Sequence, residues 1–304
     1  MDFMTKKVAF LGLGKMGGLM TKHLAEAGYH VTGYDPAPKA LAAAKKNGAR
    51  TAKTPAAAVR GADVICSSLP TPSVVREVYL GSGGALKAAR RGAVIFELST
   101  SEVALAVEIA ALAKKKGVAF LDSPVSGSIP HLKNKEVSAI VGGDRKALGK
   151  HQDILEAFCK SVTYMGPSGR GLIMKLVTNH ILGIHHAGIA EGLAFGIKAG
   201  LKAEKMVDFL QGSALPQLLF YKGPFMAARD YSEVIADVEL SKKDLGLSVE
   251  EANDLGAPVP LGVAARQQYV AAKALGLGRA DFNAVFEAYL NAAGIKPKRR
   301  GGCH

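Results

Sequence analysis

The 304-residue chain contains no tryptophan and only three cysteines. Cys66, Cys159 and Cys303 lie far apart and form no CxxC pair, so the sequence predicts neither a disulfide framework nor a zinc site. Isolated, reduced thiols are typical of the cytoplasm. Long apolar runs are missing as well, and the apolar stretch near the N-terminus is too short for a signal peptide or a membrane span. We therefore expect a soluble, unexported, cytoplasmic protein that does not enter a membrane.

Acidic side chains are scarce relative to basic ones, with 26 Asp and Glu against 39 Lys and Arg and a formal net charge of +13. A charge of this sign attracts anions, and a dinucleotide or a small carboxylate substrate would both be drawn in. Nucleic acid is another anionic partner, but no recognition motif accompanies the charge. The tight basic cluster at residues 296–300 is interpreted as a solvated terminus. The sequence thus predicts small anionic ligands and no nucleic-acid partner.

The length suits two domains rather than one, and the apolar pattern changes partway along the chain. In the first part, short apolar runs alternate with helical patterns, which is typical of βαβ units and a mainly parallel sheet. We predict an α/β fold in which residues 1–166 form a Rossmann domain with a doubly wound sheet. Strands are expected at residues 8–11, 30–34, 63–69, 93–98, 118–121 and 137–141, and helices at residues 16–27 and 40–46.

From about Gly171 onward the sequence predicts helices alone. Residues 172–198 lack proline, are rich in Leu, Ile, Val and Ala, and are long enough to form a single helix. We predict that residues 167–304 form an all-α C-terminal domain, whose apolar helices favour assembly into a homodimer or homotetramer. Its further helices are expected at residues 204–211, 239–255 and 263–275.

A glycine-rich segment at residues 12–17 directly follows the first expected strand and opens a helix. In a GxGxxG turn of this kind, Gly12 permits the tight turn, Gly14 lets the backbone approach a pyrophosphate, and Gly17 lets helix and strand pack closely. The helix N-terminus offers N–H groups and partial positive charge to the phosphates. The residues predicted to contact the dinucleotide here are Gly12, Leu13, Gly14, Lys15 and Met16.

Asp35 ends the second expected strand, at the distance where an acidic residue accepts hydrogen bonds from the adenine ribose hydroxyls. A carboxylate repels a 2′-phosphate. The two residues after it are Pro36 and Ala37, so no arginine follows that could bind such a phosphate. The sequence therefore predicts NAD rather than NADP as cofactor. The alternative is that Asp35 is only a turn residue before Pro36.

Four blocks of sequence, taken together, resemble the β-hydroxyacid dehydrogenase family, which includes 3-hydroxyisobutyrate dehydrogenase and tartronate semialdehyde reductase (2-hydroxy-3-oxopropionate reductase). The resemblance covers nearly the whole chain. In chain order the blocks run from Phe10 to Gly17, from Asp122 to Gly127, from Gly169 to Asn179, and from Lys243 to Leu245.

The resemblance implies a role for each block. The second block matches the family's substrate loop, the third its catalytic helix, and the fourth places a lysine near the nicotinamide. Turns at Leu69-Pro70 and Ser99-Thr100 match cofactor-holding loops of the family. The implied cofactor contacts beyond the glycine-rich turn are Leu69, Pro70, Thr100 and Lys243. The implied substrate contacts are Ser126, Gly127, Ser128 and Asn179.

Lys175 is the candidate general acid and base. It stands four residues before Asn179, so the two side chains share one face of the expected helix. A lysine there can give a proton to a carbonyl oxygen during reduction and take it back during oxidation. Its neighbours Met174, Leu176 and Val177 are apolar, so we expect Lys175 to interrupt a buried stretch. The alternative is an ordinary solvated lysine.

Two positions depart from the family pattern. Ser128 and Ile129 follow Ser126-Gly127 where the family commonly has a second glycine, and we expect a small pocket that suits three- or four-carbon acids. Glu97 stands where the family commonly has aspartate before Ser-Thr, and no proline follows shortly after. The second departure is expected to change local turn geometry more than chemistry.

The sequence thus predicts an enzyme that transfers a hydride between NAD and a small β-hydroxy acid, with Lys175 as general acid and base. An imine reductase-like oxidoreductase is one alternative, although that group usually carries a different proton donor at this position. A catalytically silent dinucleotide-binding protein is another, although such relatives lose the lysine. No metal is expected, because His180, His185 and His186 do not stack on one helical face and NAD chemistry needs none.

Overall fold

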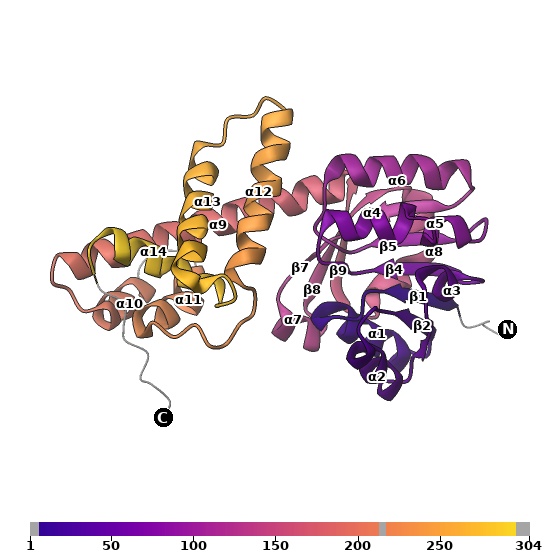
Figure 1. Ribbon diagram of the computed structural model, residues 1–304, viewed down its shortest axis with the longest axis horizontal. Coiled ribbons are helices and arrows are strands. Elements are labelled where there is room, and N and C mark those ends of the chain that lie inside the picture. The colour runs from indigo at the N-terminus through magenta and orange to yellow at the C-terminus, as the bar shows by residue number, and fades with distance from the viewer. Residues whose placement is uncertain (1–5, 213–216, 296–304) are drawn as a thin grey trace. The chain divides into compact units, whose positions relative to one another are not determined.

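The computed structural model describes residues 6–212 and 217–295. The chain divides into two compact units, and the division falls between Lys175 and Leu176. Figure 1 shows a mixed sheet with helices on its faces in the first unit and helices in the second. The predicted order, an α/β domain followed by a helical one, is confirmed.

One nine-stranded sheet organises the first unit. Its first six strands are parallel and lie in the order β3-β2-β1-β4-β5-β6, with the direction of winding reversed between β1 and β4. Next to them, β8 runs antiparallel to β6 and β7 and parallel to β9. The strands are β1 (Lys7–Leu11), β2 (His30–Tyr34), β3 (Arg50–Thr51), β4 (Val64–Ser67), β5 (Val94–Glu97), β6 (Ala119–Asp122), β7 (Val125–Ser126), β8 (Val137–Gly143) and β9 (Cys159–Gly166).

Each face of this sheet carries its own apolar core. Val8 and Phe10 of β1 point to one core, while Ala9 and Leu11 point to the other, as the two-residue period of a strand requires. Because both faces are covered, the central strands are continuous apolar runs. One face is covered by α1 (Lys15–Glu26), α2 (Pro38–Lys46), α7 (Ile129–Lys133) and α8 (Arg145–Glu156), and the other by α3 (Pro55–Val59), α4 (Pro72–Leu80), α5 (Ala85–Ala88) and α6 (Val103–Lys115).

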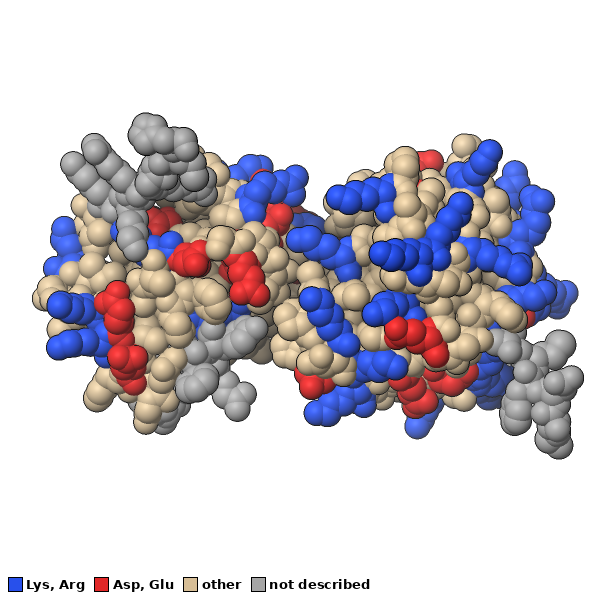
Figure 2. Space-filling model, turned by 90° about the horizontal axis from the view of Figure 1, so that it is seen from below, with Lys and Arg blue, Asp and Glu red and all other residues tan. Residues whose placement is uncertain are grey.

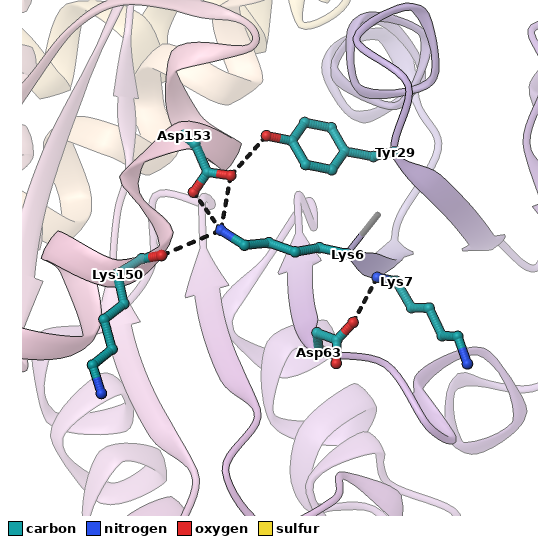
Figure 3. A network of polar contacts seen from close by, with 6 residues as sticks. All are labelled: Lys6, Lys7, Tyr29, Asp63, Lys150 and Asp153. Atoms are coloured by element: carbon teal, nitrogen blue, oxygen red, sulfur yellow. Dashed lines mark hydrogen bonds and ion pairs between the residues drawn. The ribbon is translucent and has the colours of Figure 1, made fainter. Parts of the chain in front are cut away.

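The end of the sheet where β1 begins is held by polar contacts (Figure 3). Lys6 Nζ lies 2.6 Å from Asp153 Oδ1 of α8, and the Tyr29 hydroxyl donates to the same carboxylate at 2.8 Å. The Lys7 N–H donates to Asp63 at 2.7 Å. Burial opposes the charge on Asp153, but the bonds from Lys6 and Tyr29 outweigh it and lower the pKa of the carboxyl. These contacts join β1 to α8 and to the start of β4.

The described residues of the second unit form helices and no strand. The core includes Leu193, Leu245, Tyr269 and Phe286. Among the described helices, none combines the length and the apolar character that crossing a membrane requires. The elements are α9 (Arg170–Lys198), which begins in the first unit, then α10 (Ala203–Gln211), α11 (Gln217–Ala228), α12 (Val238–Asp254), α13 (Pro260–Ala272), a π-helical turn (Lys273–Leu277), a 3-10 turn (Phe282–Ala284) and α14 (Val285–Ala292).

The expected strands and helices are all present, with bounds shifted by a few residues. The sequence did not predict β3 or β7, which have two residues each, nor β9. Lys160, Ser161 and Thr163 of β9 are polar and exposed, and within the described part of the chain β9 pairs with β8 alone. An edge strand of this kind lacks the apolar run by which the others were found.

Candidate dinucleotide and substrate site

The glycine-rich turn joins β1 to α1. Gly12 has a φ of +87°, and a Cβ there would lie 2.3 Å from the carbonyl oxygen of Ser68. A Cβ at Gly17 would lie 2.0 Å from the carbonyl oxygen of Gly12. A Cβ at Gly14, in contrast, would meet none of the described atoms within 4 Å. The fold therefore requires glycine at Gly12 and Gly17, whereas Gly14 leaves open space where a ligand can approach the N-terminus of α1.

Asp35 joins the end of β2 to this turn. Its Oδ2 accepts a hydrogen bond from the Leu13 N–H at 2.8 Å, and its Oδ1 accepts one from the Ala37 N–H at 2.8 Å. Asp35 is thus a residue of the turn before Pro36, and it also contacts the glycine-rich turn through Leu13. Each carboxylate oxygen has two lone pairs, so both oxygens keep capacity to accept from ribose hydroxyls.

The turns after β4 and β5 lie beside the glycine-rich turn. The Leu69 N–H donates to the hydroxyl oxygen of Ser99 at 2.7 Å. A Leu69 methyl carbon lies 3.0 Å from the position of a Cβ on Gly12. Pro70 is exposed and Thr100 is half-buried. Three turns therefore meet at the carboxyl ends of β1, β4 and β5, where the winding of the sheet reverses, which is the place where open α/β sheets bind ligands.

The residues of the expected substrate loop are partly strand. Ser126 belongs to β7 and pairs with Ser138 of β8. Gly127 follows with a φ of +131°, and a Cβ there would lie 2.8 Å from Val137 Cγ1, so the position demands glycine. Both the backbone N–H of Ser128 and its hydroxyl contact His131 Nδ1, at 3.3 and 2.7 Å. The Ser128 hydroxyl thus contributes to the first turn of α7.

A buried carboxylate holds the start of α9. Asp122, the last residue of β6, accepts hydrogen bonds from the Gly169 N–H at 2.7 Å and from the Leu172 N–H at 2.9 Å. Burial raises the pKa of Asp122, although these bonds oppose the shift. Lys175 follows Leu172 by three residues and is half-buried.

The expectation that Lys175 interrupts a buried stretch is wrong for two of its neighbours. Met174 is 36% exposed and Val177 43%, whereas Leu176 is buried. One side of this part of α9 packs into the protein through Leu172 and Leu176, and the period of the helix carries Met174 and Val177 to another side.

In the second unit, Asn179 and Lys243 both contact the carboxylate of Asp244, a residue that was not selected from the sequence. The Asn179 Nδ2 donates to Asp244 Oδ2 at 2.8 Å, and Asp244 Oδ1 lies 3.0 Å from Lys243 Nζ. Asp244 lies within the fourth block of the resemblance, between Lys243 and Leu245, and its place in that block could have indicated it as a site residue. One N–H of the Asn179 amide is thus committed to Asp244.

The three histidines of α9 have separate surroundings. His180 Nδ1 lies 2.9 Å from the Ser248 hydroxyl. His186 is buried edge-on against Phe282, and burial lowers its pKa to about 3. His185 is exposed. In the described ranges, His, Cys, Asp and Glu side chains form no group of three that could hold a metal ion.

Comparison with known proteins identifies both units. Residues 7–166 match the family model described as the NAD binding domain of 6-phosphogluconate dehydrogenase, and residues 169–289 match the model described as NAD-binding of NADP-dependent 3-hydroxyisobutyrate dehydrogenase. Among curated proteins, 2-(hydroxymethyl)glutarate dehydrogenase of Eubacterium barkeri is 31% identical over 95% of this chain and 96% of its own length. The NAD-dependent L-serine dehydrogenase of Pseudomonas aeruginosa is 34% identical over 92% of this chain and 96% of its own length.

Among solved structures, the 3-hydroxyisobutyrate dehydrogenase of Mycobacterium tuberculosis, determined with L-serine, has a TM-score of 0.84. It is 33% identical and the match covers 93% of this chain and 99% of that one. The similarity therefore extends over both units.

Proposed function

We propose that this chain, which belongs to the β-hydroxyacid dehydrogenase family, transfers a hydride between NAD and a small β-hydroxy acid with Lys175 as general acid and base. The family was indicated by its sequence motifs and is confirmed, and with it an NAD(P)-binding domain. The observation that carries the proposal is the position of Lys175, three residues after Leu172 in the helix that the buried Asp122 holds.

The first unit supplies the groups that would hold the cofactor. Gly12, Leu13, Gly14, Lys15 and Met16 form the turn and the first residues of α1, whose N–H groups favour phosphate. Asp35 would accept hydrogen bonds from the adenine ribose, and Leu69, Pro70 and Thr100 come from the neighbouring turns. NAD, when bound, supplies or accepts the hydride. Lys175 would donate a proton to the carbonyl oxygen in reduction and accept it in oxidation.

The relatives' names suggest which acids to test. L-Serine, 3-hydroxyisobutyrate and 2-(hydroxymethyl)glutarate all carry a CH₂OH group and a carboxylate on the same carbon, and they differ in the third substituent. We propose that the substrate shares this unit, including acids of the 2-hydroxy-3-oxopropionate type after reduction. As the resemblance implies, Ser126, Gly127 and Asn179 would bind the carboxylate, Ser128 would also contact the substrate, and Lys243 would contact the cofactor. Such two-point holding orients the carbinol and contributes several kcal/mol to the rate.

The test of the catalytic role is Lys175→Ala, with Lys115→Ala, an exposed lysine of α6, as matched control. We expect Lys175→Ala to lose about 10²–10⁴-fold in kcat for 3-hydroxy acids while NADH binds unchanged, and the control to retain wild-type turnover. A near wild-type kcat in Lys175→Ala would assign the proton to another group. Turnover of cyclic imines, with none of hydroxy acids, would instead favour the imine reductase alternative.

The cofactor preference rests on Asp35. A 2′-phosphate next to this carboxylate is repelled, so kcat/KM should be about tenfold or more higher with NAD than with NADP. Asp35→Ser, which replaces the carboxylate by an uncharged hydroxyl, should narrow that ratio. Equal values for the two cofactors in the wild type would refute the assignment.

We further propose a cytoplasmic homodimer or homotetramer. Ile181, Leu182 and Phe195 of α9 are exposed apolar side chains that a second copy would cover. Figure 2 shows Lys and Arg side chains spread over the surface of the first unit, which suits attraction of anionic substrates. Sedimentation equilibrium measures the assembly, and a monomer at micromolar concentration would reject it.

A further inference from the structure

Glu97 is a buried carboxyl group that the proposed reaction does not use. It is the last residue of β5, with 1% of its surface exposed. By the family resemblance it stands where an aspartate is common, and Leu98 separates it from Ser99 and Thr100. In the parallel register of β5 and β6, Glu97 stands opposite Asp122. Two buried carboxyl groups thus lie side by side at the carboxyl end of the sheet.

The hydrogen bonds around Glu97 converge on its carboxyl group. The Ser99 N–H donates to Glu97 Oε1 at 3.1 Å, and the Ser99 hydroxyl also bonds the carboxyl. The Ser67 hydroxyl donates to Oε1 at 3.4 Å. Because the single proton of Ser67 is then used, the Tyr79 hydroxyl, 2.7 Å away, donates to Ser67.

Through Ser99 the carboxyl group reaches the turn after β4. The Ser99 hydroxyl that bonds the Glu97 carboxyl also accepts a hydrogen bond from the Leu69 N–H, at 2.7 Å. Leu69 in turn lies against Gly12, as does the carbonyl oxygen of Ser68. A change at Glu97 therefore has a direct route through Ser99 to the turns at the switch point of the sheet.

We propose that Glu97 is a positioning residue for the nicotinamide half of the cofactor, holding the Leu69-Pro70 and Ser99-Thr100 turns in one geometry through Ser99. The inference rests on the proposed cofactor site at these turns. The glutamate side chain matters because aspartate, one methylene shorter, cannot place its oxygens at the same positions from the same backbone. Asp122 beside it organises the helix of Lys175, so each of the two carboxyl groups serves a different part of the site.

The charge state of Glu97 adds a measurable signature. Burial, together with the nearby Asp122 carboxylate, outweighs the opposing bonds from Ser99 and Ser67 and raises the pKa of Glu97 to about 7. The other titratable groups near it are Tyr79 and Cys66, which are both neutral near pH 7 because burial raises each pKa. A protonated carboxyl must donate its own hydrogen bond, which reverses one of the converging bonds. The hold on the turns therefore weakens as the pH falls through about 7.

The experiment compares Glu97→Gln with wild type, using Glu102→Gln, an exposed residue of the same segment, as matched control. NADH fluorescence enhancement measures the Kd of the whole dinucleotide. Calorimetry measures the Kd of ADP, which in the proposed site would contact the glycine-rich turn and Asp35. At about pH 8, Glu97→Gln should weaken NADH binding about fivefold and ADP binding by less than about twofold. The NADH difference should shrink below about pH 7, where wild-type Glu97 gains its proton.

Ser99→Ala and Ser99→Thr provide a second route if Glu97→Gln does not fold. Ser99→Ala should reproduce the selective loss of NADH affinity, and Ser99→Thr, which keeps the hydroxyl, should restore it. Unchanged NADH affinity in Glu97→Gln or Ser99→Ala, or equal losses for NADH and ADP, would overturn the positioning role alone. A wild-type protein that binds no NADH would overturn the cofactor site and this inference with it, whereas failure to oxidise hydroxy acids would leave both standing.

Discussion

Replacing Asp122 by asparagine should destabilise the first unit and slow turnover. The substitution keeps the size of the side chain but replaces one carboxylate oxygen by an amide N–H₂. In the protein, one oxygen accepts from the Gly169 N–H and the other from the Leu172 N–H. Asparagine has only one oxygen, so one of these two donors must face another donor.

The surrounding backbone leaves no space to relieve this conflict. A Cβ on Gly142 would lie 2.8 Å from both Asp122 carboxylate oxygens, and a Cβ on Gly171 would lie 2.5 Å from the carbonyl oxygen of Ile140. The lost charge-assisted bond contributes about 1.5–3 kcal/mol, and the unsatisfied buried N–H costs about 1–3 kcal/mol. Relief from burying a charge offsets part of this. We expect a net loss of about 3 kcal/mol in the free energy of unfolding.

Urea unfolding followed by circular dichroism measures this loss, and Asp144→Asn is the matched control. Asp144 also accepts two backbone N–H groups at a helix start, α8, but it is exposed, so about 1 kcal/mol or less is expected. Because Asp122 holds the helix of Lys175, kcat should fall at least tenfold in the folded Asp122→Asn variant. A tenfold fall corresponds to a rise of about 1.4 kcal/mol in the activation barrier. Equal stability losses in the two variants, or a wild-type kcat, would refute the reasoning.

Three further outcomes follow from the same contacts. Gly127→Ala should lose about 1–3 kcal/mol of stability and raise KM for hydroxy acids, because the φ of residue 127 is +131° and a Cβ there would lie 2.8 Å from Val137 Cγ1. Thermal unfolding measures the stability, and steady-state kinetics measure KM. Arg229→Met should cost about 3–5 kcal/mol in urea unfolding, since it leaves the buried Glu287 carboxylate without its ion pair. Glu97 has a folded-state pKa near 7 against an ordinary 4.5, so the folded protein binds more protons and its stability falls as pH rises between these values. Glu97→Gln should remove that fall, on the order of 3 kcal/mol at most, and an unchanged pH profile of unfolding would contradict it.

Local patterns in the sequence were enough for the features that depend on neighbouring residues. The turn after β1 was found because strand, glycines and helix follow one another within a few residues, and the Cβ contacts at Gly12 and Gly17 agree with the roles assigned to them. The long helix α9 was found from its composition, and the spacing of Lys175 and Asn179 within it follows from helical geometry. Gly127 was selected as part of a motif, and its positive φ gives the physical reason for glycine.

Tertiary structure decided what depends on residues far apart in the chain. Nothing local indicates that Glu97 pairs in register with Asp122, that Asp122 holds residues 169–172, or that Asp244 joins Asn179 to Lys243. Exposure of Met174 and Val177 likewise depends on which side of α9 packs against the protein. Sequence by itself indicated the longer strands other than β9 and several of the helices, because these follow from local sterics and hydrophobic period, and its motifs indicated the residues proposed for the site. The fold decided their partners and burial, because hydrogen bonds and desolvation depend on groups that meet only when strands distant in sequence lie side by side.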